Sequence, residues 1–411
     1  MIYSTRTKTE VSPSKALIDG LAKDGGLYVF KEVPLVPYKE WLGKDYHDLA
    51  KTIFGLYLTD FSKKSINKIV NTAYNDDFDP FYAGLKTYQN HAYLTLYHGA
   101  TFSFKDMALS ALPLMIEEAK SNLNINKKTL VLTATSGDTG SAALAGYEKV
   151  KNAGVIVLYP TKGVSAFQEQ QMNQYQSKQH VIYALDGNFD DCQSIIKEAF
   201  SKIDDERYLV TSANSINIGR IIPQIVYYFY AYNNLVMEQK IKAGEKINFA
   251  VPSGNFGNIY AGFIAKRMGL PIQSLIIASN QNNVLTTFFN TGVYNRNLEL
   301  KKSISPSMDI LVPSNLERYL FELLDKDSNR INSIMDDLKN KGITTIPEVL
   351  DQTDFFAYFS SEEATKQTIK TTLKEEGLLI DPHTAVAKNV YMKYIDETKD
   401  TTYTCIVSTA S

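Results

Sequence analysis

Cysteine, histidine and long apolar runs are scarce in this chain. Of its 411 residues two are cysteines, and Cys192 and Cys405 lie too far apart to form the framework of a disulfide-rich secreted domain. The five histidines are scattered, with no HExxH pattern and no cysteine cluster, which argues against a catalytic metal. No stretch reaches the roughly eighteen apolar residues of a membrane span, and the N-terminus lacks the apolar core of a signal peptide. We therefore expect a soluble cytoplasmic protein with no membrane partner.

An excess of charge of either sign is also missing. The chain has 43 basic and 45 acidic residues, a formal net charge of -2, and no basic stripe. Nucleic acid is therefore not an expected partner. Apolar residues make up 44% of the chain and charged residues 21%, values typical of a folded protein. The length predicts two or three domains.

Short apolar runs alternate with helical stretches from about residue 93 onward. This alternation predicts an α/β fold, with a mostly parallel sheet covered by helices on both faces. In such folds ligands bind beyond the carboxyl ends of the strands. Residues 321–376 are polar and rich in mixed charges, and we expect a solvated helical insertion there. The predicted strands are TLVLTA (129–134), VIVLYP (155–160), HVIYAL (180–185), NFAVP (248–252) and SLIIAS (274–279).

A single lysine, Lys105, stands in the apolar segment HGATFSFKDMAL at 98–109. On local grounds its stem packs along a hydrophobic surface while the ammonium reaches water. The alternative is a poorly solvated amine that forms a Schiff base with a carbonyl. The segment alone favours the first interpretation.

The loop TSGDTGSAA follows the strand at 129–134 and opens a helix at about Ser141. Its small residues expose backbone N–H groups at a helix N-terminus, and Ser136 and Thr139 add hydroxyl groups, a combination that suits a carboxylate or phosphate. A structural alternative is an N-cap turn in which Asp138 or Thr139 merely caps the helix.

The loop PSGNFGNIYAG follows the strand at 248–252 and again enters a helix. Gly254 and Gly257 permit a close backbone approach, so the N–H groups from Gly254 through Asn258 can surround a phosphate. The pattern is neither a Walker motif nor GxGxxG. A tight structural turn is the alternative.

In NSINIGRIIPQIVYYF, Asn214, Ser215 and Asn217 precede Arg220 at the start of an apolar helix. An arginine at this end opposes the helix dipole unless an anion lies nearby. The alternative is an exposed arginine with a small energetic cost. A pyridoxal phosphate (PLP) enzyme needs a lysine, a phosphate site and a separate carboxylate site, and this chain offers that combination.

In this order, the segments resemble those of threonine synthase, a PLP enzyme of the fold type II group. The resemblance also includes STRTKTEVSPSKALIDGLAKDGGLYVF, SPSMDILVPSNLERYL, DPHTAVA and VSTAS, and it covers nearly the whole chain. It implies two open, mostly parallel sheets with helices on both faces, plus a mainly helical N-terminal region. The implied division is 1–90 as the N-terminal region, 109–214 as a small substrate-carboxylate-binding domain, and 91–108 with 215–411 as a large PLP-binding domain.

The resemblance assigns roles by position. Lys105 would hold PLP as a Schiff base and act as the acid and base catalyst. Asp138 would contact the phenolic oxygen of the cofactor, and Thr409 would bind its pyridine nitrogen. The cofactor's phosphate would be bound by Gly254, Asn255, Phe256, Gly257 and Asn258. The substrate's carboxylate would be bound by Ser136, Gly137, Thr139 and Gly140, and its phosphate by Ser215 and Arg220.

The implied reaction converts O-phospho-L-homoserine and water into L-threonine and phosphate, by γ-elimination and β-addition. The implied partner is this small molecule, and the implied assembly is a monomer or a homodimer. Two alternatives stay open: another fold type II lyase, such as a serine or threonine dehydratase or a sulfhydrylase, and a non-catalytic protein that binds a phosphorylated metabolite. The family usually continues past VSTAS, whereas this chain stops at Ser411, so we expect the strand beside the cofactor to lose cover.

Overall fold

A six-stranded sheet in the order β14-β11-β10-β15-β5-β4 forms the larger half of the molecule. Neighbouring strands are parallel except for β4 and β5. The computed structural model describes residues 1–411 except 79, 136, 162, 188 and 204. The strands are β4 (Gly84–Thr87), β5 (His91–Thr95), β10 (Ile247–Pro252), β11 (Ile272–Ser279), β14 (Phe355–Phe359) and β15 (Thr404–Ser408).

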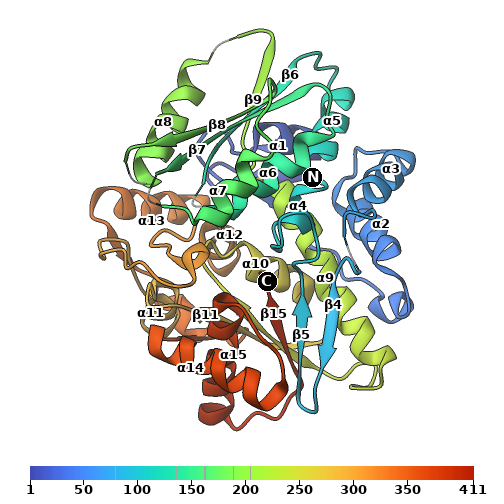
Figure 1. The fold of residues 1–411 in the computed structure, drawn as a ribbon, viewed down its shortest axis with the longest axis vertical. Coiled ribbons are helices and arrows are strands. Elements are labelled where there is room, and N and C mark those ends of the chain that lie inside the picture. The colour runs from blue at the N-terminus through green and yellow to red at the C-terminus, as the bar shows by residue number, and fades with distance from the viewer. Residues whose placement is uncertain (79, 136, 162, 188, 204) are drawn as a thin grey trace.

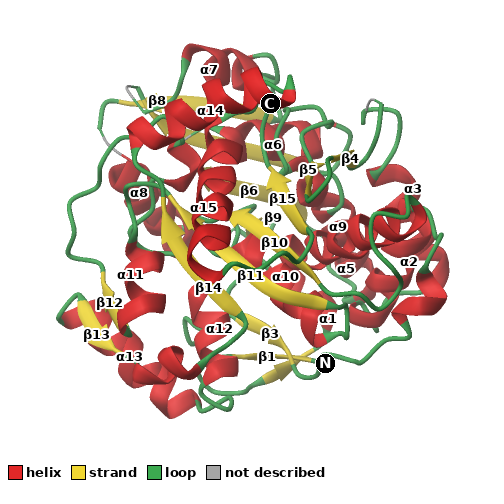
Figure 2. Ribbon diagram, turned by 90° about the horizontal axis from the view of Figure 1, so that it is seen from below, coloured by secondary structure: helices red, strands yellow, loops and turns green. Residues whose placement is uncertain are grey.

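Both faces of this large sheet are buried. Because side chains alternate along a strand, Phe249 and Val251 of β10 join one apolar core and Ala250 joins another. Helix α15 (Pro382–Thr398) lies across the Ala250 face, as Figure 2 shows. The opposite face packs against α10 (Gly257–Arg267) and α9 (Ile218–Met237), where the Tyr228 ring meets that of Phe249. Burial on both faces explains the near-continuous apolar runs of these strands.

The smaller half contains four parallel strands in the order β8-β7-β6-β9. Helix α8 covers one face, where Cys192 and Ile196 contact Leu132 and Ala134. The elements are α4 (Asp106–Leu109), α5 (Leu112–Asn122), β6 (Lys128–Ala134), α6 (Asp138–Glu148), β7 (Ala153–Pro160), α7 (Ala166–Asn173), β8 (His180–Leu185), α8 (Phe189–Lys202) and β9 (Tyr208–Thr211). All five strands expected from the sequence are confirmed.

The N-terminal region is helical, as expected, but it also contains a small antiparallel sheet in the order β2-β1-β3. Helices α2 and α3 lie at the side of the molecule, and α2 packs on α9 (Figure 1). The elements are β1 (Ile2–Ser4), β2 (Glu10–Val11), α1 (Pro13–Asp19), β3 (Tyr28–Phe30), η1 (Tyr38–Trp41), α2 (Tyr46–Tyr57) and α3 (Lys63–Ala73).

Residues 321–376 are not wholly a solvated helical insertion, as the sequence suggested. The segment contributes β14, whose Phe355 and Ala357 are buried where it pairs with β11. Among the described residues, no helix combines the length and apolarity needed to cross a membrane. The remaining elements are α11 (Val284–Thr291), β12 (Val293–Asn295), η2 (Pro306–Met308), α12 (Leu316–Leu323), α13 (Ser328–Asn340), β13 (Ile343–Thr345), η3 (Pro347–Asp351) and α14 (Glu362–Glu376).

Candidate active site

Loops at the carboxyl ends of strands bring most of the predicted site residues together. Lys105 follows β5, the SGNFGN loop follows β10 and Thr409 follows β15, so parallel pairing places all three at one edge of the large sheet. Figure 1 shows the end of the chain, just past β15, in the middle of the molecule below α4. The loop after β6 of the small sheet meets this edge through Asp138. The site therefore lies between the two halves.

The loop that carries Lys105 is held in shape by the residue that follows the lysine. The Asp106 carboxylate accepts hydrogen bonds from the Thr101 backbone N–H at 2.8 Å and from the Thr101 hydroxyl at 2.7 Å. Burial raises the pKa of Asp106 to about 6, although these two donors oppose the shift. A Cβ atom at Gly99 would lie 2.6 Å from that of Asp106, so this turn requires glycine. The Phe104 N–H donates to the Thr409 carbonyl at 2.8 Å, which fixes the lysine beside the end of β15.

The Lys105 amine lies inside the site and is paired there, whereas the local interpretation suggested a side chain that extends to water. Its side chain is 12% exposed, and Nζ donates to Asp138 Oδ2 at 2.8 Å. The Ser307 hydroxyl donates to the same oxygen at 2.6 Å, and Gln168 Nε2 donates to Oδ1 at 2.6 Å. Burial opposes ionisation of Asp138, but the charge and hydrogen bond of Lys105, with the Ser307 hydroxyl, hold the pKa of this carboxyl below its usual range.

The helix that follows the TSGDTG loop begins earlier than the sequence suggested. Helix α6 starts at Asp138 and not near Ser141. Gly137 has a φ of 137°, a backbone conformation that favours glycine, and a Cβ atom there would lie 2.3 Å from the end of the Gln168 side chain. The N–H groups of Gly137 and Gly140 both donate to the Thr135 hydroxyl oxygen at 3.0 Å. Two of the donors predicted for a carboxylate therefore have a partner within the loop. Thr139 lies in the first turn of α6, and Ser136 lies outside the described residues.

The SGNFGN loop turns sharply between β10 and α10. Phe256 adopts a left-handed conformation with a φ of 63°, which a non-glycine residue takes only at some cost. Its buried ring stacks on that of Phe289, with centroids 5.8 Å apart, and this packing offsets the cost. The Asn255 carbonyl accepts from the Asn315 backbone N–H at 3.0 Å. A Cβ atom at Gly254 would lie 2.8 Å from the Ser307 carbonyl oxygen, so this position also requires glycine.

Asn258 has an unused donor at the start of α10. Its Oδ1 accepts from the hydroxyl groups of Tyr227 at 2.6 Å and Tyr228 at 2.8 Å, which fixes the amide orientation. Nδ2 is buried and has no hydrogen-bond partner in the part of the chain that the structure describes. A buried polar group without a partner costs about 1–3 kcal/mol. Together with the N-terminus of Gly257–Arg267, this donor suits an anion.

Arg220 lies in the first turn of α9, whose N-cap is Asn217. The structural alternative required an exposed arginine, but only 3% of Arg220 is accessible. That alternative is therefore wrong. Nη1 donates to the Ala213 carbonyl at 2.7 Å, while Nε is buried with no partner among the residues described. Burial lowers the pKa of Arg220 to about 10, so the group remains a cation at neutral pH. Ser215 lies half-buried in the preceding loop.

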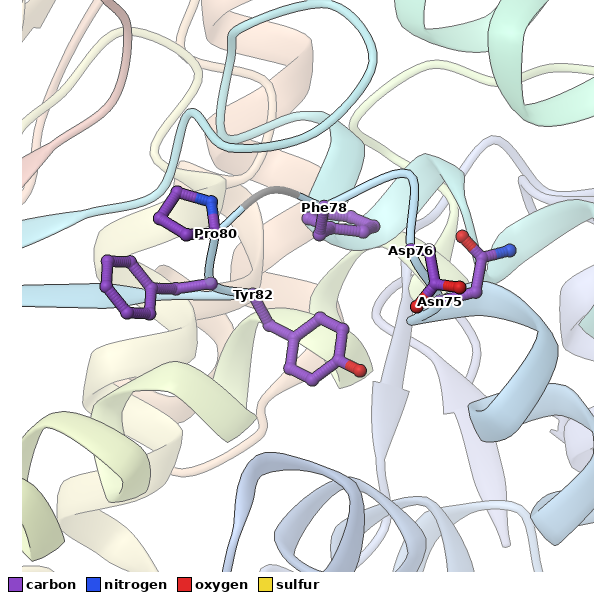
Figure 3. A pocket seen from close by; sticks show the side chains of 6 residues that line it. Asn75, Asp76, Phe78, Pro80 and Tyr82 are labelled. Atoms are coloured by element: carbon purple, nitrogen blue, oxygen red, sulfur yellow. The ribbon is translucent and has the colours of Figure 1, made fainter.

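Three polar side chains were not assigned from the sequence. Ser307 and Gln168 hold the Asp138 carboxylate, and the His383 ring acts electrostatically on the same carboxylate. Each comes from an element distant in sequence from Asp138, so local spacing could not identify it. Figure 3 shows a separate pocket. One of its lining residues, Phe81, has its ring 5.8 Å from that of His98, in the segment that carries Lys105. None of the predicted site residues lines it; its lining residues are Asn75, Asp76, Phe78, Pro80, Phe81 and Tyr82.

Known proteins share the fold of this chain and part of its sequence. A family model described as pyridoxal-phosphate dependent enzyme matches residues 94–409, and one described as threonine synthase N terminus matches 2–74. Threonine synthase of Schizosaccharomyces pombe is 36% identical, over 95% of this chain and 83% of its own length. Threonine synthase-like 1 of Macaca fascicularis is 37% identical over 97% of this chain, which spans 56% of that protein. The crystal structure of PLP-bound threonine synthase from Brucella melitensis superimposes with a TM-score of 0.91 and 34% identity, over 100% of this chain and 88% of that one.

These similarities confirm the predicted fold type II architecture, PLP as the cofactor and threonine synthase as the function. They favour this activity over the dehydratase and sulfhydrylase alternatives, because the N-terminal match is specific to threonine synthase. The chain belongs to the threonine synthase family of PLP-dependent lyases.

Proposed function

We propose that Lys105 holds PLP and carries the protons of a reaction that converts O-phospho-L-homoserine and water into L-threonine and phosphate. The observation that carries this proposal is the position of the amine. Nζ lies inside the site, 2.8 Å from Asp138 Oδ2, at the contact between the two halves. A flexible amine in this position can reach several neighbouring carbons in turn.

The residues present fit PLP. The unpaired Nδ2 of Asn258 and the N-terminus of α10 offer donors to the cofactor phosphate, with Gly254 leaving room for the backbone to approach. Thr409 is 6% exposed and lies beside the lysine loop, where its hydroxyl would meet the pyridine nitrogen. When bound, PLP supplies an electron sink for carbanion chemistry. These residues would hold it against Lys105.

Arg220 is assigned to the substrate phosphate. Its buried Nε lacks a partner within the described part of the chain, and its charge persists at neutral pH. A guanidinium binds a phosphate through charge-assisted hydrogen bonds and stabilises the charge that develops as phosphate departs. Ser215 is assigned to the same group. Gly137, Thr139 and Gly140, together with Ser136, are assigned to the substrate carboxylate, which would then replace Thr135 as the acceptor for two backbone N–H groups.

Asp138 has two tasks in this scheme. It holds the Lys105 ammonium before the cofactor arrives, and it would lie beside the phenolic oxygen of PLP afterwards. Ser307 and Gln168 fix both of its oxygens, so the carboxylate stays in place when the lysine moves. We further propose the division into 1–90, 109–214, and 91–108 with 215–411, acting as a monomer or a homodimer.

The test is phosphate release from O-phospho-L-homoserine by the purified chain, with and without added PLP. We expect equal amounts of phosphate and threonine, dependence on PLP, and loss of both products in Lys105→Ala. Ammonia release from threonine without phosphate release from phosphohomoserine would support a dehydratase instead. Binding of phosphohomoserine with no absorbance near 400 nm after PLP addition would support a non-catalytic binding protein.

A further inference from the structure

The first turn of α15 presents an imidazole that no role described so far uses. His383 Nδ1 lies 2.9 Å from Asp381 Oδ1, and the two side chains are 12% and 5% exposed. Asp381 is also the N-cap of α15 and accepts from the backbone N–H groups of His383 and Thr384. Because an ionised carboxylate only accepts hydrogen bonds, this contact requires a hydrogen on Nδ1. In the neutral ring, Nε2 is then the acceptor.

This second nitrogen is buried beside the candidate active site. Nε2 has no hydrogen-bond partner in the described part of the protein. A protonated His383 ring would lower the pKa of Asp138, which places the ring near that carboxylate, and Asp138 contacts the Lys105 amine. On the other side, the Thr384 hydroxyl lies 2.8 Å from that of Ser408, the neighbour of Thr409. The ring therefore lies near Asp138 and near the end of β15, two of the places expected to contact the cofactor.

We propose that His383 Nε2 accepts the proton of the water molecule that adds to the substrate, while Asp381 holds the ring in the required tautomer. This inference rests on the proposed threonine synthase reaction. A carboxylate, an imidazole fixed by it and a free Nε2 form the arrangement by which proteins activate an O–H group. In this inference Lys105 carries the protons on carbon, and His383 serves the proton on oxygen.

The proton balance closes within the reaction. One O–H bond of water breaks, its electron pair forms the new C–O bond at the β-carbon, and the proton moves to Nε2. Lys105 returns a proton to the α-carbon. Phosphate has already left in the preceding elimination, in which the proton lost from the β-carbon is returned at the γ-carbon. This released phosphate takes the proton from Nε2, so the ring regains its neutral form without any added reactant.

The test compares two products of one reaction mixture in the PLP-loaded full chain. In His383→Asn we expect phosphate release to continue while the amount of threonine formed per phosphate falls by at least about tenfold, because general base catalysis contributes about 10²–10⁴-fold to such a step. The missing threonine should appear as a 2-oxo acid and ammonia, the products of an unsaturated amino acid that escapes water addition. An absorbance near 400 nm reports cofactor loading independently of turnover.

A second variant keeps the test valid if His383→Asn does not load PLP. Asp381→Asn retains an N-cap side chain, but its amide can donate to Nδ1 and so allow the other tautomer, with a hydrogen on Nε2. We expect the same change in product ratio. The matched control is His47→Asn, since this half-buried ring of α2 contacts the Tyr74 carbonyl at 2.7 Å, outside the site. Its product ratio should equal that of the parent.

An unchanged ratio of threonine to phosphate in His383→Asn and Asp381→Asn would overturn the inference. An equal fall of both products in both variants would also overturn it, since that result indicates a structural role. Failure of the parent chain to release phosphate would refute the proposed function itself, and the two outcomes are therefore distinguishable.

Discussion

Replacing Arg220 by glutamine is expected to lower kcat/KM much more than it lowers the free energy of unfolding. Arg220 uses one nitrogen for a protein acceptor, the Ala213 carbonyl, and keeps a buried Nε without a partner among the described residues. Loss of a charge-assisted hydrogen bond to the substrate phosphate costs about 1.5–3 kcal/mol, or roughly 10- to 150-fold in kcat/KM. The bond to Ala213 contributes about 1 kcal/mol net, and removal of a buried charge offsets part of that.

A second buried arginine provides the matched control. Arg318 is 0% exposed, and burial lowers its pKa to about 10, as for Arg220. All three of its nitrogens donate within the protein, to the Tyr28 carbonyl, to Asn315 Oδ1 and to the Ile216 carbonyl. Glutamine there would leave two acceptors without donors, at a cost of roughly 2–6 kcal/mol in the free energy of unfolding.

The assays are phosphate release against substrate concentration for kcat/KM, urea denaturation for stability, and absorbance near 400 nm for cofactor loading. Arg220→Gln should load PLP and unfold at nearly the parent urea concentration while turning over poorly. Arg318→Gln should unfold at lower urea. If Arg220→Gln lost as much stability as Arg318→Gln and retained the parent kcat/KM, Arg220 would be a structural residue and the phosphate assignment would be wrong.

Three further substitutions test the loops around the site. Burial raises the folded-state pKa of Asp106 to about 6, so the free energy of unfolding should fall by roughly 3 kcal/mol as pH rises from about 4 to above 6. Asp106→Asn should remove that loss in urea titrations, and a variant with the same pH profile as the parent would contradict the assignment. Gly254→Ala places a methyl group 2.8 Å from the Ser307 carbonyl oxygen, and PLP titration should show an affinity at least tenfold weaker. Asn258→Asp sets a carboxylate against the cofactor phosphate, and PLP affinity should fall by about 100-fold or more; equal affinity would place the phosphate elsewhere.

Five of the strands, and the loops that follow two of them, were predictable because their signals are local, whereas β4, β5, β9 and β15 were not predicted. The apolar runs at β6, β7, β8, β10 and β11 are short, buried and bounded by turn residues, so composition alone indicates them. The glycines of SGNFGN mark a turn in any context. Strand β14 was missed because FFAYF stands between long polar helices, and only its pairing with β11 shows that it completes a sheet edge.

The environment of the lysine was not predictable from neighbours in sequence. Local reasoning suggested a side chain that reaches water, yet Asp138, 33 residues further along the chain, pairs with Lys105 inside the molecule. Ser307, 202 residues away, completes that contact. Contacts of this kind depend on how the two sheets pack. The resemblance to a family located the lysine, but only the folded chain identified Ser307, Gln168 and His383 as its surroundings.

The central claim, that Lys105 is the cofactor lysine, is tested most directly by trapping the bond. The PLP-loaded chain is reduced with borohydride, digested and sequenced by mass spectrometry. The account predicts one phosphopyridoxyl group, on the peptide that contains Lys105, and none in Lys105→Ala under the same conditions. A label on another lysine of the parent chain, or an equally labelled Lys105→Ala variant, would contradict it.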